Sequence, residues 1–135
     1  ATRPDLQLYF IGFAEFHVAR LQITAFIERN YSTEADDILL AFHEAAGNAL
    51  RHGSDKRPIF VRLRDYREYM SIRIKDSGRG FDSSRNNIDI SIETSERRAL
   101  ACNGRGIGIM RECMDQVYFS RNGNEVLLVK KLQRR

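Results

Sequence analysis

Hydrophobic and polar positions recur along the chain with two different periods, and the period separates the expected helices from the expected strands. Between Asp37 and Gly53 the apolar side chains recur every three to four residues, the spacing of an amphipathic helix that packs one face into a core. These apolar positions are Ile38, Phe42, Ala45, Ala46 and Ala49. Thr33, followed three residues later by Asp36, is typical of a capping box before this helix, and Gly53 suits the residue after its last turn.

A second amphipathic helix is expected earlier in the chain, from Gly12 to Asn30, after a short strand from Asp5 to Phe10. Four apolar positions of this helix share one face by their spacing, so we expect them to face the core. They are Ala14, Val18, Leu21 and Ala25. Arg20 interrupts the apolar character of the helix, and we interpret it as a side chain that lays its carbon stem on apolar surface and keeps its charge in water.

The middle of the chain changes to a period of two, which predicts two strands with one buried face each, joined by a turn at residues 65–67. The inward positions are Ile59, Val61 and Leu63 in the first strand and Met70, Ile72 and Ile74 in the second. By the same alternation Asp76 shares the inward face of the second strand. A carboxylate in a core is unfavourable unless a partner binds it, so Asp76 is a candidate ligand-binding residue.

Glycine-rich and polar segments follow this strand. Residues 76–81 read Asp-Ser-Gly-Arg-Gly-Phe, and glycines let a backbone turn tightly and lie close to a ligand. Residues 82–103 are polar and long for a connection inside a domain, which is typical of a functional lid or of a disordered segment. Residues 104–108 read Gly-Arg-Gly-Ile-Gly and lead into a short helix, so backbone N–H groups and the helix dipole predict a phosphate cradle there.

The end of the chain predicts a hairpin. After the short helix, which contains Ile109, Met110 and Cys113, two strands are expected at Gln116–Ser120 and Glu125–Leu132. Asn122-Gly123 lies between them, and this dipeptide favours a two-residue type I′ turn. No internal repeat accompanies these elements.

Composition narrows the class of protein but does not indicate a function. The chain has 135 residues, 42% of them hydrophobic and 30% charged, as expected for one soluble domain with a single core. It has no apolar run long enough for a membrane span and no secretion signal at its start, so we expect a cytoplasmic protein. Cys102 and Cys113 are the only cysteines and are interpreted as free thiols. The net charge of +4 permits acidic partners, but no aromatic residues interleave with the basic ones as a platform for bases.

The expected helix at 37–53 carries the candidate chemistry. Glu44 and Asn48 lie four residues apart and therefore project from one side, with Arg51 and His52 beside the same row. An acid next to an amide can accept a proton and bind a hard cation. Taken alone, however, this pair is more typical of a solvated helix face.

Several other motifs fail on inspection. His43-Glu44 begins like a zinc-protease helix, but Gly47 stands where the second histidine is needed. Gly104 and Gly106 do not make a dinucleotide-binding fingerprint, because Ile109 stands where its third glycine belongs. The chain has no Gly-Lys-Ser/Thr phosphate loop and no histidine and cysteine spacing typical of structural zinc.

The remaining motifs have a fixed order. Glu44-x-x-x-Asn48-x-x-x-His52-Gly53 comes first, then Asp76-x-Gly78-x-Gly80, then the polar segment, then Gly104-x-Gly106-x-Gly108. This order resembles the N, G1 and G2 boxes of the GHKL or Bergerat-fold (HATPase_c) ATPases. The resemblance implies an α/β (α+β) two-layer sandwich, with a mostly antiparallel sheet covered on one face by helices and a flexible ATP lid at about 82–103. Residues 1–135 would form one ATP-binding kinase domain, or a piece of a longer regulator.

The resemblance also implies roles for the site residues. Asp76 would accept a hydrogen bond from the adenine amino group, Asn48 would bind Mg²⁺, and Glu44 would act as the catalytic base. The backbone of the three glycines of the last box would reach the phosphates, and a neighbouring arginine would add positive charge. The complete set expected to bind ATP is Asn48, His52, Asp76, Gly78, Gly80, Gly104, Arg105, Gly106 and Gly108.

Within this superfamily the chain looks most like the anti-sigma-factor serine/threonine-protein kinases of bacteria. It lacks room for the transducer domains of topoisomerases, mismatch-repair proteins and chaperones, and it shows no phosphoacceptor histidine helix of a sensor kinase. The resemblance implies a homodimer that phosphorylates a serine of a small anti-sigma-factor antagonist, with a sigma factor as a second candidate partner, and that binds no membrane and no nucleic acid directly. Three alternatives stay open: a nucleotide-gated protein-binding module, the C-terminal kinase module of a multidomain response regulator, and a basic nucleic-acid-binding module.

Overall fold

The computed structural model describes residues 3–52, 57–76, 106–121 and 123–133, with the side chain of His52 left out. Its elements are β1 (Asp5–Phe10), α1 (Gly12–Asn30), α2 (Ala35–His52), β2 (Ile59–Asp65), β3 (Tyr69–Asp76), α4 (Gly106–Cys113), β4 (Gln116–Phe119) and β5 (Glu125–Lys131). All of the expected strands and helices are present in these ranges. No helix in the described part of the chain is long and apolar enough to span a bilayer.

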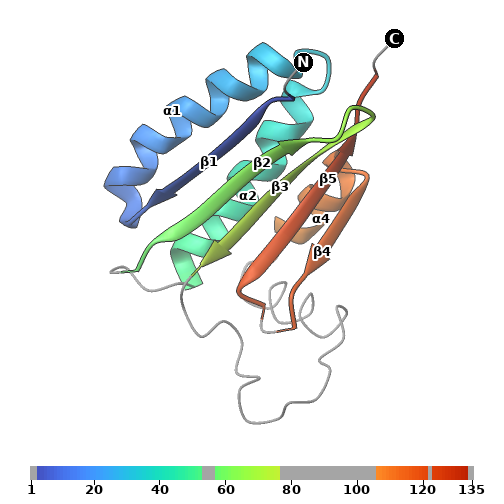
Figure 1. Cartoon of the computed structure of the whole chain (residues 1–135). Helices are drawn as coiled ribbons and strands as arrows, with labels where there is room; N and C mark the ends of the chain where they lie inside the picture. Colours follow the sequence, from blue (N-terminus) through green and yellow to red (C-terminus); the bar gives the residue numbers. More distant parts are fainter. Residues whose placement is uncertain (1–2, 53–56, 77–105, 122, 134–135) are drawn as a thin grey trace.

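The five described strands form one sheet in the order β1-β2-β3-β5-β4. Each neighbouring pair is antiparallel. All three described helices lie against one face of the sheet and leave its other face open (Figure 1). The expected two-layer α+β fold with helices on one face is therefore confirmed.

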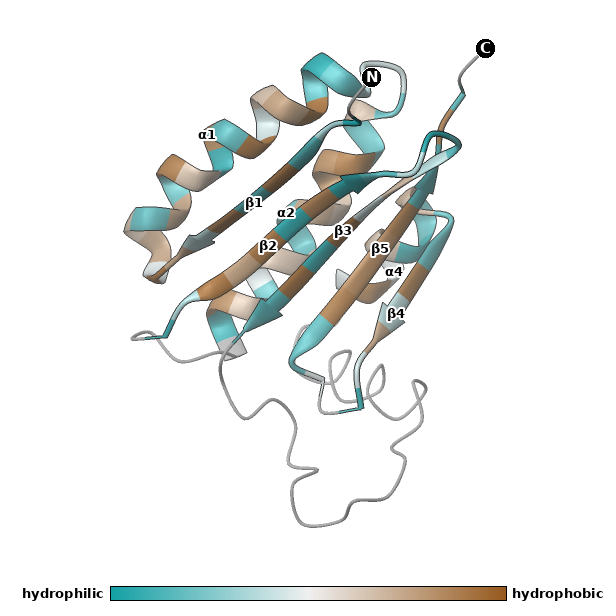
Figure 2. Ribbon diagram, viewed as in Figure 1, coloured by the Kyte–Doolittle hydropathy of each residue, from teal (hydrophilic) through white to brown (hydrophobic). Residues whose placement is uncertain are grey.

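The core lies between the sheet and the three described helices. Along β2 and β3, hydrophobic and hydrophilic residues alternate as the period of two predicts (Figure 2). Each of the six predicted inward positions in these strands is buried, and so are the five predicted apolar positions of α2. Asp76 is buried on the same inward face and is only 7% exposed, as its place in the alternation predicts.

The prediction for α1 is wrong. Its four expected core positions are all exposed, and Val18 and Leu21 are 63% and 66% exposed. The helix instead buries Ala19, Ile23, Phe26 and Ile27. Because this helix carries apolar residues on more than one side, its pattern alone could not say which side packs against the sheet.

Two local predictions also need correction. Helix α2 begins at Ala35, and the predicted capping box does not form, because Thr33 makes no hydrogen bond with any described residue. The first hydrogen bond of the helix runs from Ile38 N–H to the backbone carbonyl of Glu34, at 3.1 Å. The closing hairpin is present, but its loop is longer than a two-residue turn. Gly123 N–H donates to the Ser120 carbonyl at 3.0 Å, and Gly123 has a φ of 73°.

A buried hydrogen bond joins the α1–α2 connection to the β2–β3 turn. Tyr31 is 1% exposed, and its hydroxyl donates to Asp65 Oδ2 at 3.0 Å. The second carboxylate oxygen of Asp65 accepts from Arg67 N–H at 2.7 Å, and this holds the turn in which Arg67 has a φ of 78°. Both oxygens of this buried carboxylate are therefore hydrogen-bonded, which compensates its burial.

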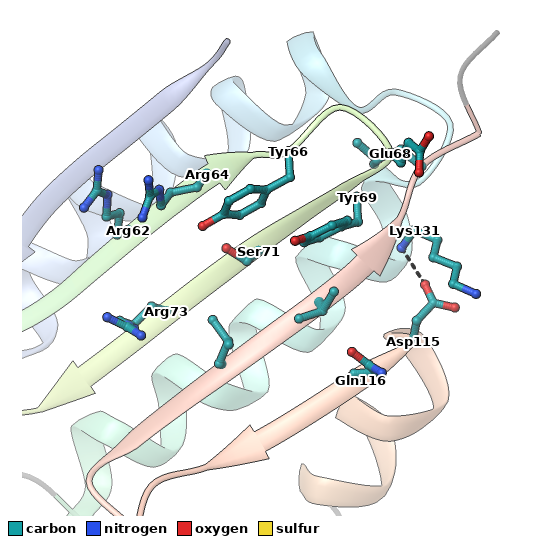
Figure 3. Close-up of a pocket in the computed structure, with 13 residues that line it drawn as sticks. Arg62, Arg64, Tyr66, Glu68, Tyr69, Ser71, Arg73, Asp115, Gln116 and Lys131 are labelled. Atoms are coloured by element: carbon teal, nitrogen blue, oxygen red, sulfur yellow. Dashed lines mark hydrogen bonds between the residues drawn. The ribbon is translucent and has the colours of Figure 1, made fainter.

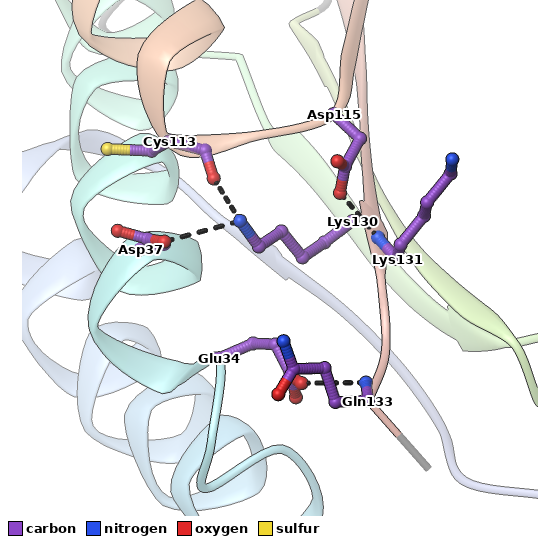
Figure 4. A network of polar contacts seen from close by, with 7 residues as sticks. All are labelled: Glu34, Asp37, Cys113, Asp115, Lys130, Lys131 and Gln133. Carbon is purple, nitrogen blue, oxygen red and sulfur yellow. Dashed lines mark hydrogen bonds and ion pairs between the residues drawn. The ribbon is translucent and has the colours of Figure 1, made fainter.

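A second polar contact joins α2, α4 and β5 at the same end of the sheet. Lys130 of β5 donates from Nζ to the backbone carbonyl of Cys113 at 2.6 Å and pairs with Asp37 of α2 at 3.2 Å (Figure 4). The ammonium thus caps the C-terminus of α4, where the helix dipole favours positive charge. Cys113 is a free, buried thiol, and burial, followed by the charges of Asp37 and Glu112, raises its pKa above the ordinary value.

Candidate functional site

Helix α2, the end of β3 and helix α4 meet around a small cavity on the inner side of the sheet. The cavity has a volume of about 40 Å³. Asn48 of α2 and Asp76 of β3 both line it, and apolar walls come from Ala45, Ala49, Ile74 and Met110. Two residues that the sequence places 28 positions apart in separate motifs are therefore brought together.

Asp76 is the last residue of β3 and lies at the edge of this cavity. Its backbone N–H donates to the carbonyl of Asn124 at 2.9 Å, which ties the strand end to the β4–β5 loop. Asp76 is only 7% exposed, and it lines the cavity beside Ile74. A carboxylate in such apolar surroundings is suited to accept a hydrogen bond from a ligand N–H.

Asn48 shares its amide oxygen with a neighbouring cation. Arg51 donates from Nη2 to Asn48 Oδ1 at 2.8 Å, one turn along the same helix. Gly47 makes room for this arginine, because a Cβ at that position would lie 3.2 Å from Arg51 Nη1. The predicted row through Asn48 and Arg51 is therefore a hydrogen-bonded contact, and a side chain at position 47 would require the exposed guanidinium of Arg51 to shift by a few tenths of an ångström.

Glu44 lies one helical turn before Asn48 and is half-buried, but it does not line the cavity of the described residues. Its neighbour His43 lies toward α1. Burial, followed by the positive charge of Arg20, lowers the pKa of His43 below its ordinary value of 6.5. His43 Nε2 is buried and makes no hydrogen bond to any described residue, which favours a neutral imidazole near pH 7.

Helix α4 brings its N-terminus near the same cavity. It begins at Gly106, which is buried, and Met110 one turn later lines the cavity. The first-turn N–H groups of the helix have no partner within the helix itself and favour an anion. Gly108 is exposed, and a Cβ there would meet nothing within 4 Å, so space does not require glycine at this position in the described structure.

Several predicted site residues lie outside the described part of the chain. They are Gly78, Gly80, Gly104, Arg105, the segment 82–103 and the side chain of His52. Their roles remain predictions. Phe119, Asn124 and Val126, which also line the cavity, were not predicted as site residues. For Phe119 and Val126 the only signal was their place in the closing strands, and for Asn124, in the β4–β5 loop, there was none.

The described residues fit part of a nucleotide site. About 40 Å³ is room for about three water molecules, so a nucleotide must extend beyond the walls described here. Within the described residues no group of three or more histidine, cysteine, aspartate and glutamate side chains gathers. A magnesium site here would have few protein ligands, as Mg²⁺ sites completed by water and phosphate oxygens do.

Comparison with known proteins agrees with this arrangement. The sequence profile of the family described as Histidine kinase-like ATPase domain matches residues 14–130, from early in α1 to the end of β5. The match spans the α2, β3 and α4 segments that form the cavity. A comparison with curated proteins gives no match.

Proposed function

Because the chain belongs to the histidine kinase-like ATPase family, we propose that it is an Mg²⁺-ATP-dependent protein serine kinase. In this proposal it acts as an anti-sigma factor that phosphorylates a small antagonist protein in a bacterial partner-switching pathway. The family match supports ATP binding. The choice of serine as acceptor and of an antagonist as partner is the finer step, which rests on the resemblance of the motifs.

One observation supports the proposal most strongly: Asn48 and Asp76 line one cavity on the inner side of the sheet. Their side-chain oxygens match what the amino group of adenine and a magnesium ion need. Asp76 would accept from the exocyclic amino group of adenine, and the buried setting would make this contact selective, since the carboxylate has little access to water. Asn48 would bind Mg²⁺ through its amide oxygen, and the ion would supply charge neutralisation at the phosphates.

Arg51 would regulate the access of a cation to Asn48. Its guanidinium already binds the oxygen that the cation needs, at 2.8 Å. An amide oxygen has two lone pairs, so both contacts are possible, but the two positive charges would repel each other. We therefore expect Arg51→Met to lower the Mg²⁺ concentration at which ATP binding is half-maximal.

Glu44 is the residue that would take the proton from the attacking serine hydroxyl. It projects from the same side of α2 as Asn48, one turn away, because four residues separate them. Phosphoryl transfer depends chiefly on positioning and charge, so a single base of this kind is sufficient. Its carboxylate would need only to reach the acceptor serine.

The test is phosphate transfer from ATP to the serine of purified antagonist proteins. Glu44→Gln should reduce the transfer rate by about 100-fold or more and leave the stabilisation by ATP intact. The control is Glu28→Gln, an exposed position on α1, which should change neither. If Glu44→Gln leaves transfer unchanged, Glu44 is not the base. If no antagonist is phosphorylated but ATP changes its affinity, the chain is a nucleotide-gated binding module instead.

We also propose that the chain forms a homodimer, as the resemblance implies. The apolar side chains that α1 leaves in solvent support a protein contact on that helix, with Phe13, Val18 and Leu21 each more than half exposed. Leu21→Glu should then give a monomer in light-scattering measurements. A wild-type protein that is monomeric at all concentrations tested would contradict the dimer without affecting the nucleotide site.

A further inference from the structure

The open face of the sheet carries a second, larger hollow, far from the motifs singled out in the sequence. It has a volume of about 670 Å³ and lies over β2, β3 and β5, on the side that no described helix covers (Figure 3). This volume is within the range of about 300–1,000 Å³ that is typical of small-molecule sites. The nucleotide cavity lies on the opposite side of the sheet, so the two are separate.

The floor and walls of this hollow combine polar and apolar side chains. Ser71 of β3 lies at its floor and is only 6% exposed, and its side-chain hydroxyl makes no hydrogen bond to any described residue. Leu127, Val129 and Leu132 provide an apolar side and are partly buried. A buried hydroxyl beside apolar surface is the combination that fixes the orientation of a small ligand.

Two tyrosines form the upper wall. The rings of Tyr66 and Tyr69 stack with centroids 4.9 Å apart and planes 18° from parallel. They remain 37% and 40% exposed, so each retains ring surface and a hydroxyl for a ligand. Figure 3 shows both rings reaching over β3 toward Ser71. Rigid aromatic surface of this kind binds flat apolar groups at little entropic cost.

Arg64 supplies a positive charge that no described carboxylate neutralises. Two other arginines of the hollow already have partners: Arg62 pairs with Asp5 at 3.0 Å and Arg73 pairs with Glu125 at 3.0 Å. Arg64 instead lies 5.4 Å from the centre of the Tyr66 ring and makes no ion pair with any described carboxylate. Its donors are therefore available to an anion, and the aromatic ring holds the guanidinium in place.

We propose that this hollow binds a small organic anion, with a carboxylate or phosphate group on a flat, preferably aromatic, body. The anionic group binds Arg64 and accepts from the Ser71 hydroxyl, and the body lies against the tyrosine pair and Val129. Charge also argues against a nucleic acid as the occupant. Two of the four cations that line the hollow are paired, and Glu68 and Asp115 line it too, which leaves little attraction for a chain of phosphates.

Amide NMR titrations of the isotope-labelled full chain test the proposal. Phenyl phosphate and phenylacetate serve as the anionic probes at millimolar concentration, with benzyl alcohol as the neutral probe and inorganic phosphate as the probe without a ring. We expect at least one aromatic anion to shift the amides of Ser71 and Val129 and to saturate. Benzyl alcohol and inorganic phosphate should bind more weakly. Whichever aromatic anion saturates distinguishes a carboxylate ligand from a phosphate ligand.

Matched variants make the result specific to the hollow. Arg64→Glu should weaken binding about tenfold or more, and Ser71→Ala should weaken it several-fold. Lys75→Glu is the control, because it makes the same change of charge on the neighbouring strand β3, at an exposed position outside the hollow, and it should leave affinity nearly unchanged. Thermal unfolding of each variant shows whether it is folded.

Four results would overturn the proposal. The first is no saturable shift with either aromatic anion. The second is an equal loss of affinity in Arg64→Glu and Lys75→Glu, which would indicate attraction by overall charge alone. The third is a set of shifts confined to Asn48 and Asp76, which would place the probes in the nucleotide cavity. Binding of oligouridine with a steep salt dependence, without binding of the small anions, would also replace the proposal with a nucleic-acid surface.

Discussion

On the helix-covered face of the sheet, the buried carboxylates of Asp65 and Asp76 lie at strand ends, and Tyr31 and Arg67 hold that of Asp65 in place. The open face carries many more polar side chains, but its ion pairs are between partly or largely exposed groups. Arg73 is 54% exposed in its pair with Glu125, and Asp5 is 47% exposed in its pair with Arg62. Exposed pairs of this kind contribute little to stability, about 0–1 kcal/mol each.

This difference indicates that polar side chains have different roles on the two faces. Polar contacts of the inner face stabilise the fold, whereas polar side chains of the open face can bind a ligand with little effect on stability. The same chemical change should therefore have unequal effects on the two sides. Matched pairs of substitutions, one on each face, test this directly.

The largest difference is expected for the two tyrosine hydroxyls. Tyr31→Phe removes the donor to the buried Asp65 carboxylate and should lower the free energy of unfolding by about 1–3 kcal/mol. Tyr69→Phe, on the open face, should change it by less than about 0.5 kcal/mol. Urea unfolding of both variants measures the difference. Equal losses would show that the inner hydrogen bond is no more important than an exposed hydroxyl.

A smaller difference is expected for two adjacent lysines of β5. Lys130→Met removes the contacts with the Cys113 carbonyl and with Asp37, and should cost about 1–2 kcal/mol, since Asp37 is 57% exposed and its share is screened by solvent. Lys131 is exposed, its side chain makes no hydrogen bond with a described residue (Figure 4), and Lys131→Met should have almost no effect. If the two variants have equal midpoints in chemical denaturation, the Lys130 contact does not stabilise the fold.

The smallest effect concerns pH and belongs to the inner layer alone. The pKa of His43 is lower in the folded protein than its ordinary value of 6.5, first because of burial and then because of Arg20. The unfolded chain therefore binds the proton more tightly, and stability should fall as the pH drops below about 6.5. Unfolding free energies measured between about pH 7.5 and about pH 5.5 should fall less steeply in His43→Asn. Equal slopes in wild type and variant would contradict this.

The sequence predicted the inner face better than the open face for a physical reason. Asn48 and Asp76 each belong to a short motif, and helix periodicity and strand alternation fix the direction in which each side chain points. No short segment of the sequence determines the order of the strands in the sheet. Tyr66, Tyr69 and Arg64 were therefore dispersed aromatic and basic residues until the sheet brought them beside Leu127.

The errors have similar causes. In α1 the apolar residues surround the helix, so its buried side depends on tertiary packing rather than on period. The contact between Arg51 and Asn48 was visible only as spacing, because a flexible side chain can adopt many rotamers on a helix surface. The β4–β5 loop is longer than the turn that Asn-Gly favours, because the hairpin closes at Ser120 and Glu125 even though Gly123 has the positive φ that a type I′ turn needs.

The most direct test of the account is the stabilisation of wild type and Asp76→Asn by ATP with Mg²⁺ in thermal unfolding. ATP at about 100 times its dissociation constant should add about 2.7 kcal/mol to the stability of the wild type. The account predicts that this shift requires Mg²⁺ for its full size and is lost in Asp76→Asn, whatever the stability of the variant without ligand. An equal shift in both proteins would remove Asp76 from the site, and no shift in the wild type at millimolar ATP would contradict the nucleotide site itself.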